Sequence, residues 1–411
     1  MVCKLSLSSW NSNRKSYFIA AHIVSFYLDC VRDFYHLHPA VLNCRPKMNV
    51  SQLYIDSSVS DLPAAKDFER RLGLKPTIID NSRVLYNLIK ESPDPWQAGK
   101  QTIFLTRNYG PFVRHCPGTR DYICCDYKIL HFGTYCTMDC AYCILQSYFH
   151  PPVLQYFINH EDLITELEDT LGQNSCFRIG TGEFTDSLIW ESWSDLTSKL
   201  IDIFSQQHYS VLELKTKTTA IGHLKNRPHQ RKTILSWSLN TPYVICSQER
   251  GTSTLNARLR AAAQCQEWGY PLAFHFDPIV VYPGCESHYR EVIKTLFDNV
   301  RADNIVWISL GTFRYMPDLH GVIQERFPQS EIIHGEFIPG LDGKMRYFKP
   351  LRIKIYELMV EWIRAHNKDV VVYLCMEDEK VWTQTIGFNP ATKGGLAAML
   401  DQSAKLHCDL K

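Results

Sequence analysis

Short apolar runs and longer amphipathic stretches alternate along most of the chain after about residue 126. The apolar runs have the length of buried strands, and the stretches between them carry apolar residues at helical spacing. We predict strands at residues 128–132, 177–180, 211–216, 234–239, 272–276 and 305–310, and helices at residues 161–171, 187–204, 255–268 and 286–297.

Strands separated by helices in this way predict a parallel sheet with right-handed crossover connections. The simplest way for such a sheet to curve and close is a partial (β/α)6 barrel of the TIM type, so the expected fold class is α/β. We expect the barrel to occupy residues 126–345, with its chemistry at the carboxyl ends of the strands. A C-terminal helix–strand–helix region follows at residues 346–411, with a helix at 351–366 and a strand at 370–374.

The N-terminal part of the chain shows a different pattern. Residues 48–125 predict a smaller α/β region that begins with a strand at 52–55, a helix at 64–72 and a strand at 77–79. The hydrophobic residues within positions 1–47 follow no regular helical or strand spacing. This segment is either a real N-terminal extension or an artefact of a gene model whose true start is Met48.

Composition narrows the class of protein. Hydrophobic residues make up 45% of the chain and charged residues 21%, with a net charge of +1, so no overall field recruits nucleic acid or a membrane surface. The 15 cysteines are scattered in a long chain, which does not resemble a secreted disulfide framework. No apolar run is long enough to cross a membrane. We expect a cytoplasmic protein with a thiolate-bound metal.

One loop carries the candidate metal ligands. Cys136, Cys140 and Cys143 stand in a C-x3-C-x2-C spacing directly after the first predicted barrel strand. Four thiolates close a [4Fe–4S] cluster, whereas three leave one iron open. In enzymes whose [4Fe–4S] cluster is held by three cysteines, the open iron binds S-adenosylmethionine (SAM). An electron from the cluster then cleaves SAM to a 5′-deoxyadenosyl radical.

Two other interpretations of the loop remain open. The cysteines are either unliganded or bind zinc, which prefers a fourth protein ligand. Cys124, Cys125 or His131 would supply that ligand.

The same loop resembles the signature of the radical SAM superfamily, in which an aromatic residue, here Tyr142, precedes the third cysteine. Its continuation through Gln146 resembles the spore photoproduct lyase family. Similar segments follow in the family's order over roughly residues 50–375. They are residues 180–183, 216–217, 238–240, 249–253 with Arg258, 269–272, Arg314, and the pair Arg346 and Tyr347.

This resemblance implies a [4Fe–4S] cluster and SAM as cofactors. Acceptors such as Glu183 suit the ammonium of SAM, and a cation such as Lys217 suits its carboxylate. The alternatives are a charge at a helix N-terminus for Glu183 and a solvated strand end for Lys217. The cofactor contacts implied by the resemblance are Tyr142, Gly182, Glu183, Lys217, Ser238, Asn240 and Arg258.

The family resemblance also implies a carbon–carbon lyase that repairs a photoproduct in DNA. Its partners would be damaged DNA and an electron donor such as ferredoxin or flavodoxin, with no membrane. Two positions depart from the family: its hydrogen-donor cysteine is Thr181 here, and its relay tyrosine is Ile144.

Neither replacement can pass on a hydrogen atom easily, so other residues must be considered. We predict Cys375 and Tyr347 as candidate catalytic residues; the alternative for Cys375 is a buried apolar role. The competing functional hypotheses are a radical SAM enzyme with an unrelated substrate and a non-catalytic iron–sulfur or zinc-binding protein.

Overall fold

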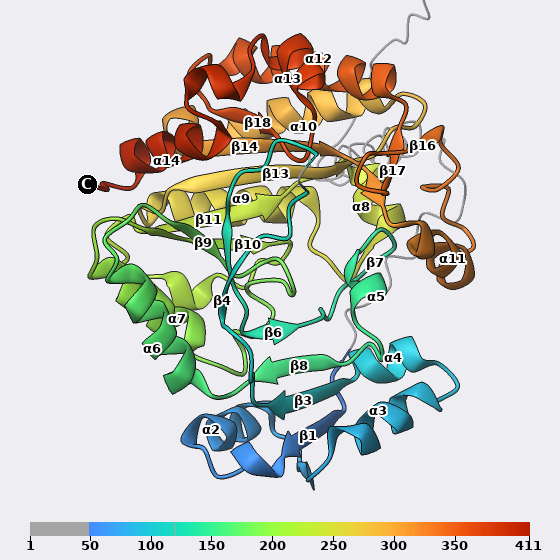
Figure 1. Ribbon diagram of the computed structural model, residues 1–411, viewed down its shortest axis with the longest axis vertical. Helices are drawn as coiled ribbons and strands as arrows, with labels where there is room; N and C mark the ends of the chain where they lie inside the picture. Colours follow the sequence, from blue (N-terminus) through green and yellow to red (C-terminus); the bar gives the residue numbers. More distant parts are fainter. Residues whose placement is uncertain (1–48, 120) are drawn as a thin grey trace, which may run out of the picture. The chain divides into compact units, whose positions relative to one another are not determined.

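The computed structural model describes residues 49–119 and 121–411, and the predicted extension at residues 1–47 lies outside this part. In the described part, the largest sheet is a curved row of parallel strands that follow one another in chain order (Figure 1). The strands are β5 (Lys128–Leu130), β9 (Arg178–Gly180), β10 (Val211–Thr216), β11 (Thr233–Ser238), β13 (Leu272–Ile279), β14 (Ile305–Thr312) and β18 (Val372–Leu374).

All the predicted barrel strands are therefore present and parallel, as the alternating pattern requires. The sheet also gains β18 beside β14, from the region expected to follow the barrel. At its other end, β4 (Val113–His115) pairs antiparallel with β5. Every residue of β11 and β14 is buried, because helices cover the outer face while side chains fill the inner one.

The helices of the barrel lie mostly where helical spacing predicts them. They are α6 (His160–Leu171), α7 (Leu196–Ser205), α9 (Leu255–Glu267), α10 (Cys285–Asn299), α12 (Lys349–His366), α13 (Glu379–Ile386) and α14 (Leu396–His407).

The prediction of a helix at residues 187–204 is wrong in its first half. Residues 187–193 form turns, residues 194–195 have no regular structure, and the helix begins only at Leu196. Ser187 pairs with the end of β10 instead: its N–H donates to the Lys215 carbonyl over 3.1 Å, and its hydroxyl accepts from the Lys215 N–H over 2.9 Å. These bonds take the backbone away from a helical path.

A second, smaller sheet confirms the predicted N-terminal α/β elements. Its strands are β2 (Thr77–Ile79), β1 (Gln52–Asp56), β3 (Thr102–Thr106), β8 (Leu154–Phe157) and β6 (Gly133–Thr134), in this order. The helices α2 (Pro63–Leu72), α3 (Ser82–Lys90) and α4 (Pro95–Lys100) belong to the same region. The chain leaves β6, forms the cysteine loop with β7 (Asp139–Cys140) and α5 (Leu145–Tyr148), and returns through β8.

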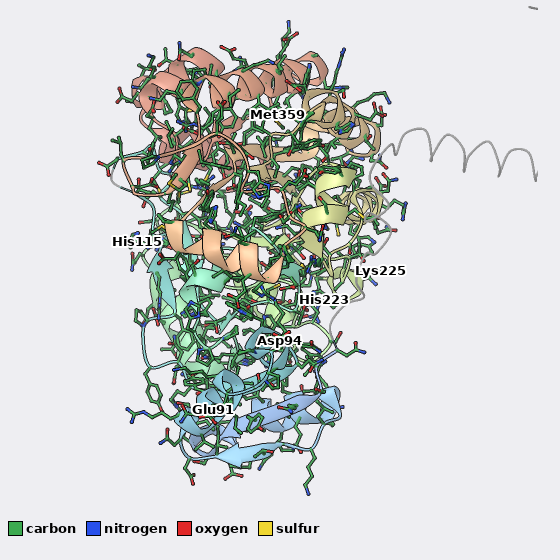
Figure 2. All side chains as sticks on the ribbon, turned by 90° about the vertical axis from the view of Figure 1, so that its right-hand side faces the viewer. Glu91, Asp94, His115, His223, Lys225 and Met359 are labelled. Carbon is green, nitrogen blue, oxygen red and sulfur yellow. The ribbon has the colours of Figure 1, made fainter. Side chains whose placement is uncertain are left out.

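C-terminal elements lie beside the cysteine loop. β15 (Arg314–Tyr315), β17 (Met345–Tyr347) and β16 (Phe337–Pro339) form a small antiparallel sheet, and α11 (Pro317–Arg326) precedes it. Figure 2 shows Glu91 and Asp94 of the small N-terminal sheet region at the opposite end from Met359 of α12. None of the described helices has the length and apolar character needed to cross a membrane.

Candidate active site at the carboxyl ends of the barrel strands

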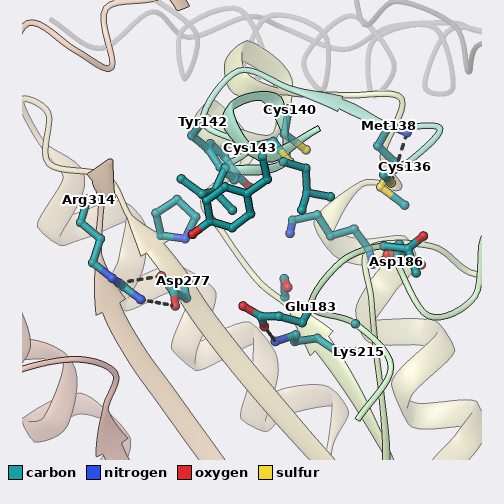
Figure 3. A pocket seen from close by; sticks show the side chains of 18 of the residues that line it. Cys136, Met138, Cys140, Tyr142, Cys143, Glu183, Asp186, Lys215, Asp277 and Arg314 are labelled. Atoms are coloured by element: carbon teal, nitrogen blue, oxygen red, sulfur yellow. Dashed lines mark hydrogen bonds and ion pairs between the residues drawn. The ribbon is translucent and has the colours of Figure 1, made fainter. Parts of the chain in front are cut away.

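A cavity of about 270 Å³ opens where the barrel strands end, as the fold class predicts. Most of the predicted site residues line it: Cys136, Cys140, Cys143, Tyr142, Gly182, Glu183, Lys217 and Ser238. Asn240, Arg258, Tyr347 and Cys375 are not among its lining residues. Figure 3 shows the cysteine loop on one side of the cavity and Glu183 with Lys215 facing it.

The cysteine loop is held from several directions. The buried ammonium of Lys100 donates to the carbonyls of Cys136, over 2.9 Å, and of Met138. On the far side, β7 pairs with β12 (Glu249–Arg250), so that Cys140 lies opposite Glu249. These contacts hold the loop by its backbone, and its three cysteines line the cavity.

Gln146, the last residue of the family-like motif, acts on the same loop. Its amide Nε2 donates to the carbonyl of Ala141 over 3.0 Å and reaches those of Cys140 and Cys143 at 3.3 Å. Arg326 of α11 donates to the Gln146 side-chain oxygen and to Asp139, the latter over 2.9 Å. Gln146 thus shapes the loop without facing the cavity.

The three thiols fit a [4Fe–4S] cluster in which three of the four irons each bind one thiolate. Three thiols of one short loop line one cavity, and the proposed fourth zinc ligands, Cys124, Cys125 and His131, are not among its lining residues. Among the described residues, no group of three or more His, Cys, Asp or Glu side chains is arranged to hold a single metal ion. No disulfide joins two cysteines within residues 49–119 and 121–411.

The opposite wall of the cavity carries charges on the ends of β9 and β10. Glu183 and Lys215 form an ion pair at 3.8 Å. Lys217 Nζ lies 5.9 Å from the centre of the Tyr142 ring, and the Lys217 N–H donates to Asp186 over 2.8 Å. Because α7 begins only at Leu196, Glu183 is not a charge at a helix N-terminus.

Arg258 and Glu249 form a buried pair behind this wall. The Arg258 guanidinium is fully buried and lies 2.5 Å from the Glu249 carboxylate. It also donates to the Ser238 carbonyl over 2.8 Å and to the Ser253 carbonyl over 2.9 Å. The hydroxyl of Tyr142 donates to the other Glu249 oxygen over 2.5 Å. Burial raises the pKa of Glu249, but the charges of Arg258 and Lys217, together with the hydrogen bonds from Tyr142 and Arg258, lower it below its ordinary value.

Two further predicted residues lie in the surrounding structure. Asn240 is 1% exposed and makes hydrogen bonds with Pro278, Tyr289 and Thr241. The Tyr347 hydroxyl accepts from the Val281 N–H over 3.2 Å and is buried. Their predicted contacts with cofactor or substrate remain predictions.

Cys375 lies beside the cavity rather than in its lining. Arg314 makes a bidentate ion pair with Asp277, with both N–O distances 3.1 Å, and its Nη2 lies 3.3 Å from the Cys375 sulfur. Arg314 and Asp277 both line the cavity (Figure 3). Arg314 is thus the ion-pair partner of Asp277 on the cavity wall.

Sequence reasoning missed Lys215 and Asp277, both on the wall of the cavity. The signal for Lys215 was present: Glu213, Lys215 and Lys217 alternate along β10, so they share the face that turns into the barrel. Glu213 confirms this, since its carboxylate accepts from His275 over 2.7 Å inside the barrel. No comparable pattern marks Asp277.

The family model described as spore photoproduct lyase matches residues 123–337, slightly more than half of the chain. The chain belongs to the spore photoproduct lyase family. The matched residues include the cysteine loop and the strand ends that surround the cavity.

Curated spore photoproduct lyases align with the same part of the chain. The enzyme of Bacillus subtilis is 27% identical over 208 residues, and that of Clostridium acetobutylicum is 24% identical over 217 residues. The alignments cover 49% and 52% of this chain, and 60% and 62% of those two proteins.

Solved spore photoproduct lyase structures share the fold. One in complex with dinucleoside spore photoproduct superposes with a TM-score of 0.70 at 20% identity, covering 80% of this chain and 99% of that one. Another, a mutant with bound AdoMet and dinucleoside spore photoproduct, gives 0.69 at 21% identity with the same coverage. The predicted α/β fold, a partial barrel, is thereby confirmed.

The two departures from the spore photoproduct lyase pattern have different surroundings. The Thr181 hydroxyl is buried and donates to Ser187 over 2.7 Å, outside the cavity lining. Ile144, by contrast, lines the cavity. Cys176 precedes β9, whereas the cavity residues Gly182 and Glu183 follow that strand.

Proposed function

We propose that the chain is a radical SAM enzyme that uses a [4Fe–4S] cluster bound by Cys136, Cys140 and Cys143. The observation that carries this proposal is the shared cavity: the three thiols face the strand ends that hold Glu183 and Lys217. Membership of the spore photoproduct lyase family supports it, as does the similar structure with bound AdoMet.

The chain's own residues bind and orient in this proposal. When bound, the cluster supplies an electron and an open iron site for the reductive cleavage of SAM to a 5′-deoxyadenosyl radical. Glu183 accepts hydrogen bonds from the ammonium of SAM, and Lys217 pairs with its carboxylate. Tyr142, fixed by Glu249, closes the cavity beside them. Arg258 donates to the Ser238 carbonyl and Asn240 to the Pro278 carbonyl, so each holds a cavity-lining residue in place from outside the lining.

Damaged DNA is the substrate class that we propose, with carbon–carbon bond cleavage in a photoproduct. The family and the dinucleoside complexes of the similar structures support this choice. The cavity lining carries four cationic side chains (Lys215, Lys217, Arg314 and Lys344) against three carboxylates (Glu183, Asp186 and Asp277), and this excess of positive charge suits an anionic substrate. A donor such as ferredoxin or flavodoxin, in a reducing cytoplasm, would deliver the electron.

Thr181 and Ile144 favour a second candidate, a radical SAM enzyme with another substrate. Anaerobic incubation of the cluster-loaded chain with SAM, dithionite and dinucleotide photoproducts distinguishes the two. Repaired dinucleotide supports the lyase. If 5′-deoxyadenosine forms without repair, the second candidate is correct, and if neither product forms, the radical SAM proposal fails.

SAM binding should depend on Lys217. Replacing it with alanine removes a charged partner of the SAM carboxylate, which is worth roughly 1.5–3 kcal/mol, so we expect SAM affinity to fall by about tenfold or more. Isothermal titration of SAM into cluster-loaded protein measures this. Lys225→Ala, which removes an exposed lysine outside the cavity lining (Figure 2), is the matched control. Equal affinities for the two variants would remove Lys217 from the SAM site.

Cys375 is the hydrogen donor that we propose in place of the family cysteine. Burial raises its pKa to about 11, so the thiol keeps its hydrogen at neutral pH. In Cys375→Ala, 5′-deoxyadenosine should still form while the normal product falls several-fold and radical-derived adducts appear. Cys176→Ala, at the opposite end of β9, should leave both yields unchanged. An unaltered product yield in Cys375→Ala contradicts this role.

A further inference from the structure

One side of the cysteine loop is held by an arginine that does not line the cavity. Arg326, the last residue of α11, donates to Asp139 over 2.9 Å and to the side-chain oxygen of Gln146. Its guanidinium carbon also lies 4.4 Å from the centre of the Trp96 ring and 4.7 Å from that of the Phe327 ring. Arg326 thereby joins α11 to α4 and to the loop, which are far apart in the sequence (Figure 1).

A second cation reaches the same loop from α4. Gly99 lets this helix approach the backbone of Pro152 closely, since a Cβ at that position would overlap the Pro152 carbonyl oxygen. Lys100 comes next in the chain, and its ammonium lies 3.6 Å from the Asp139 carboxylate and 4.5 Å from the centre of the Tyr135 ring. Together with its hydrogen bonds to two loop carbonyls, these contacts fix Lys100 against the loop.

Asp139 lies between the two cations. Its Oδ1 oxygen accepts from Arg326 and also faces Lys100. Burial raises the pKa of Asp139, but the charges of Lys100 and Arg326, together with the hydrogen bond from Arg326, lower it below its ordinary value. All three side chains are largely buried, with 4%, 9% and 13% of Lys100, Arg326 and Asp139 exposed. Two cations and one carboxylate leave one net positive charge against the loop.

Positive charge beside an iron–sulfur cluster favours its reduced form. Reduction adds one electron to the cluster, and the potential at which this happens depends on the charges and hydrogen bonds around it. Charges act more strongly inside a protein than in water, because the surroundings are less polar. Lys100 and Arg326 bind carbonyls and side chains of the loop rather than lining the cavity, so both act as positioning residues.

We propose that Arg326 and Lys100 form a cationic clamp that fixes the cysteine loop and raises the reduction potential of the cluster bound there. This inference rests on the proposed [4Fe–4S] cluster and names the residues that tune it. The electron comes from a reductant such as dithionite or ferredoxin, which is oxidised. The cluster gains that electron, and no covalent bond of the clamp forms or breaks.

Redox titration of the full, cluster-loaded chain under anaerobic conditions measures the charge effect. Arg326→Met keeps a long side chain without the charge, so at a fixed applied potential the ratio of reduced to oxidised cluster should fall by about tenfold. For a one-electron couple this is a shift of about 59 mV to lower potential. Arg326→Lys keeps the charge and should stay close to the parent chain. Asp139→Asn should shift the potential upwards, because it leaves both cations without their carboxylate.

Opposite shifts separate the charge effect from a general loss of packing, which would not move Arg326→Met and Asp139→Asn in different directions. Lys225→Met removes an exposed charge outside the cavity lining and should leave the potential unchanged (Figure 2). Equal potentials in Arg326→Met and the parent chain, or shifts of the same sign in the two variants, would overturn the clamp. If Arg326→Met holds no cluster, the sign of the shift in Asp139→Asn decides.

Hydrogen exchange tests the hold on the loop without any cluster. In the full chain before iron is added, amide exchange in residues 136–146 should be at least several-fold faster in Arg326→Met and Lys100→Met than in the parent chain, since each variant removes hydrogen bonds to the loop. Lys225→Met should exchange at the parent rate. Unchanged exchange in both clamp variants contradicts the proposal even when the chain binds a cluster. A parent chain that binds no cluster overturns the radical function and the effect on the potential instead.

Discussion

Replacing any one of Cys136, Cys140 or Cys143 with alanine is expected to abolish the iron–sulfur cluster. Anaerobically reconstituted protein should carry about four iron and four sulfide per chain, with broad absorbance at roughly 400 nm. Each of the three thiols would bind a different iron, so losing one should remove most of the iron rather than a third of it. Iron and sulfide analysis, together with the absorbance spectrum, measures the effect.

The control for this series is Cys176→Ala, which removes a thiol on the other side of β9 from the cavity. It should keep its full cluster. If the purified chain contained zinc alone and no cluster could be rebuilt, the proposed cofactor and the radical function would both be wrong.

Glu249→Ala should have the largest effect on stability. It leaves the fully buried Arg258 guanidinium without its carboxylate, and breaking a buried ion pair in this way costs about 3–5 kcal/mol. It also removes the acceptor of the Tyr142 hydroxyl, next to the strand pairing that holds Cys140. We expect a lower free energy of unfolding by urea denaturation and a weaker hold on the cluster.

Two variants make this result specific. Glu249→Gln keeps oxygen and nitrogen atoms near Tyr142 and Arg258 and should be less destabilising than alanine. Glu267→Ala breaks an exposed pair with Arg301, at 3.4 Å, and should change stability by no more than about 1 kcal/mol. A Glu249→Ala protein as stable as Glu267→Ala would show that the buried pair does not support the loop.

The cysteine loop and the strand ends were predictable because they depend on local order along the chain. In a parallel barrel, residues that follow successive strands meet at one end, so Glu183, Lys217 and Ser238 had to lie near the loop after β5. The alternation along β10 likewise determined that Lys215 shares a face with Lys217, although it was overlooked.

Other residues could not be placed from local order. The pattern of residues 187–195 suits a helix, but hydrogen bonds to Lys215, distant in sequence, hold Ser187 in a turn. Arg258 follows a family-like segment, yet its guanidinium is directed at Glu249 and at backbone carbonyls behind the cavity. Which way a long side chain turns depends on the acceptors that tertiary packing brings to it.

By itself, then, the sequence determined the α/β partial barrel, the end at which its cavity opens and the three cysteines that line that cavity. These follow from hydrophobic period and residue spacing, which act over short distances. The tertiary structure alone decided that β18 joins the barrel sheet and that Glu249 pairs with Arg258. These contacts join residues whose separation along the chain carries no periodic signal, so only the folded backbone brings them within reach.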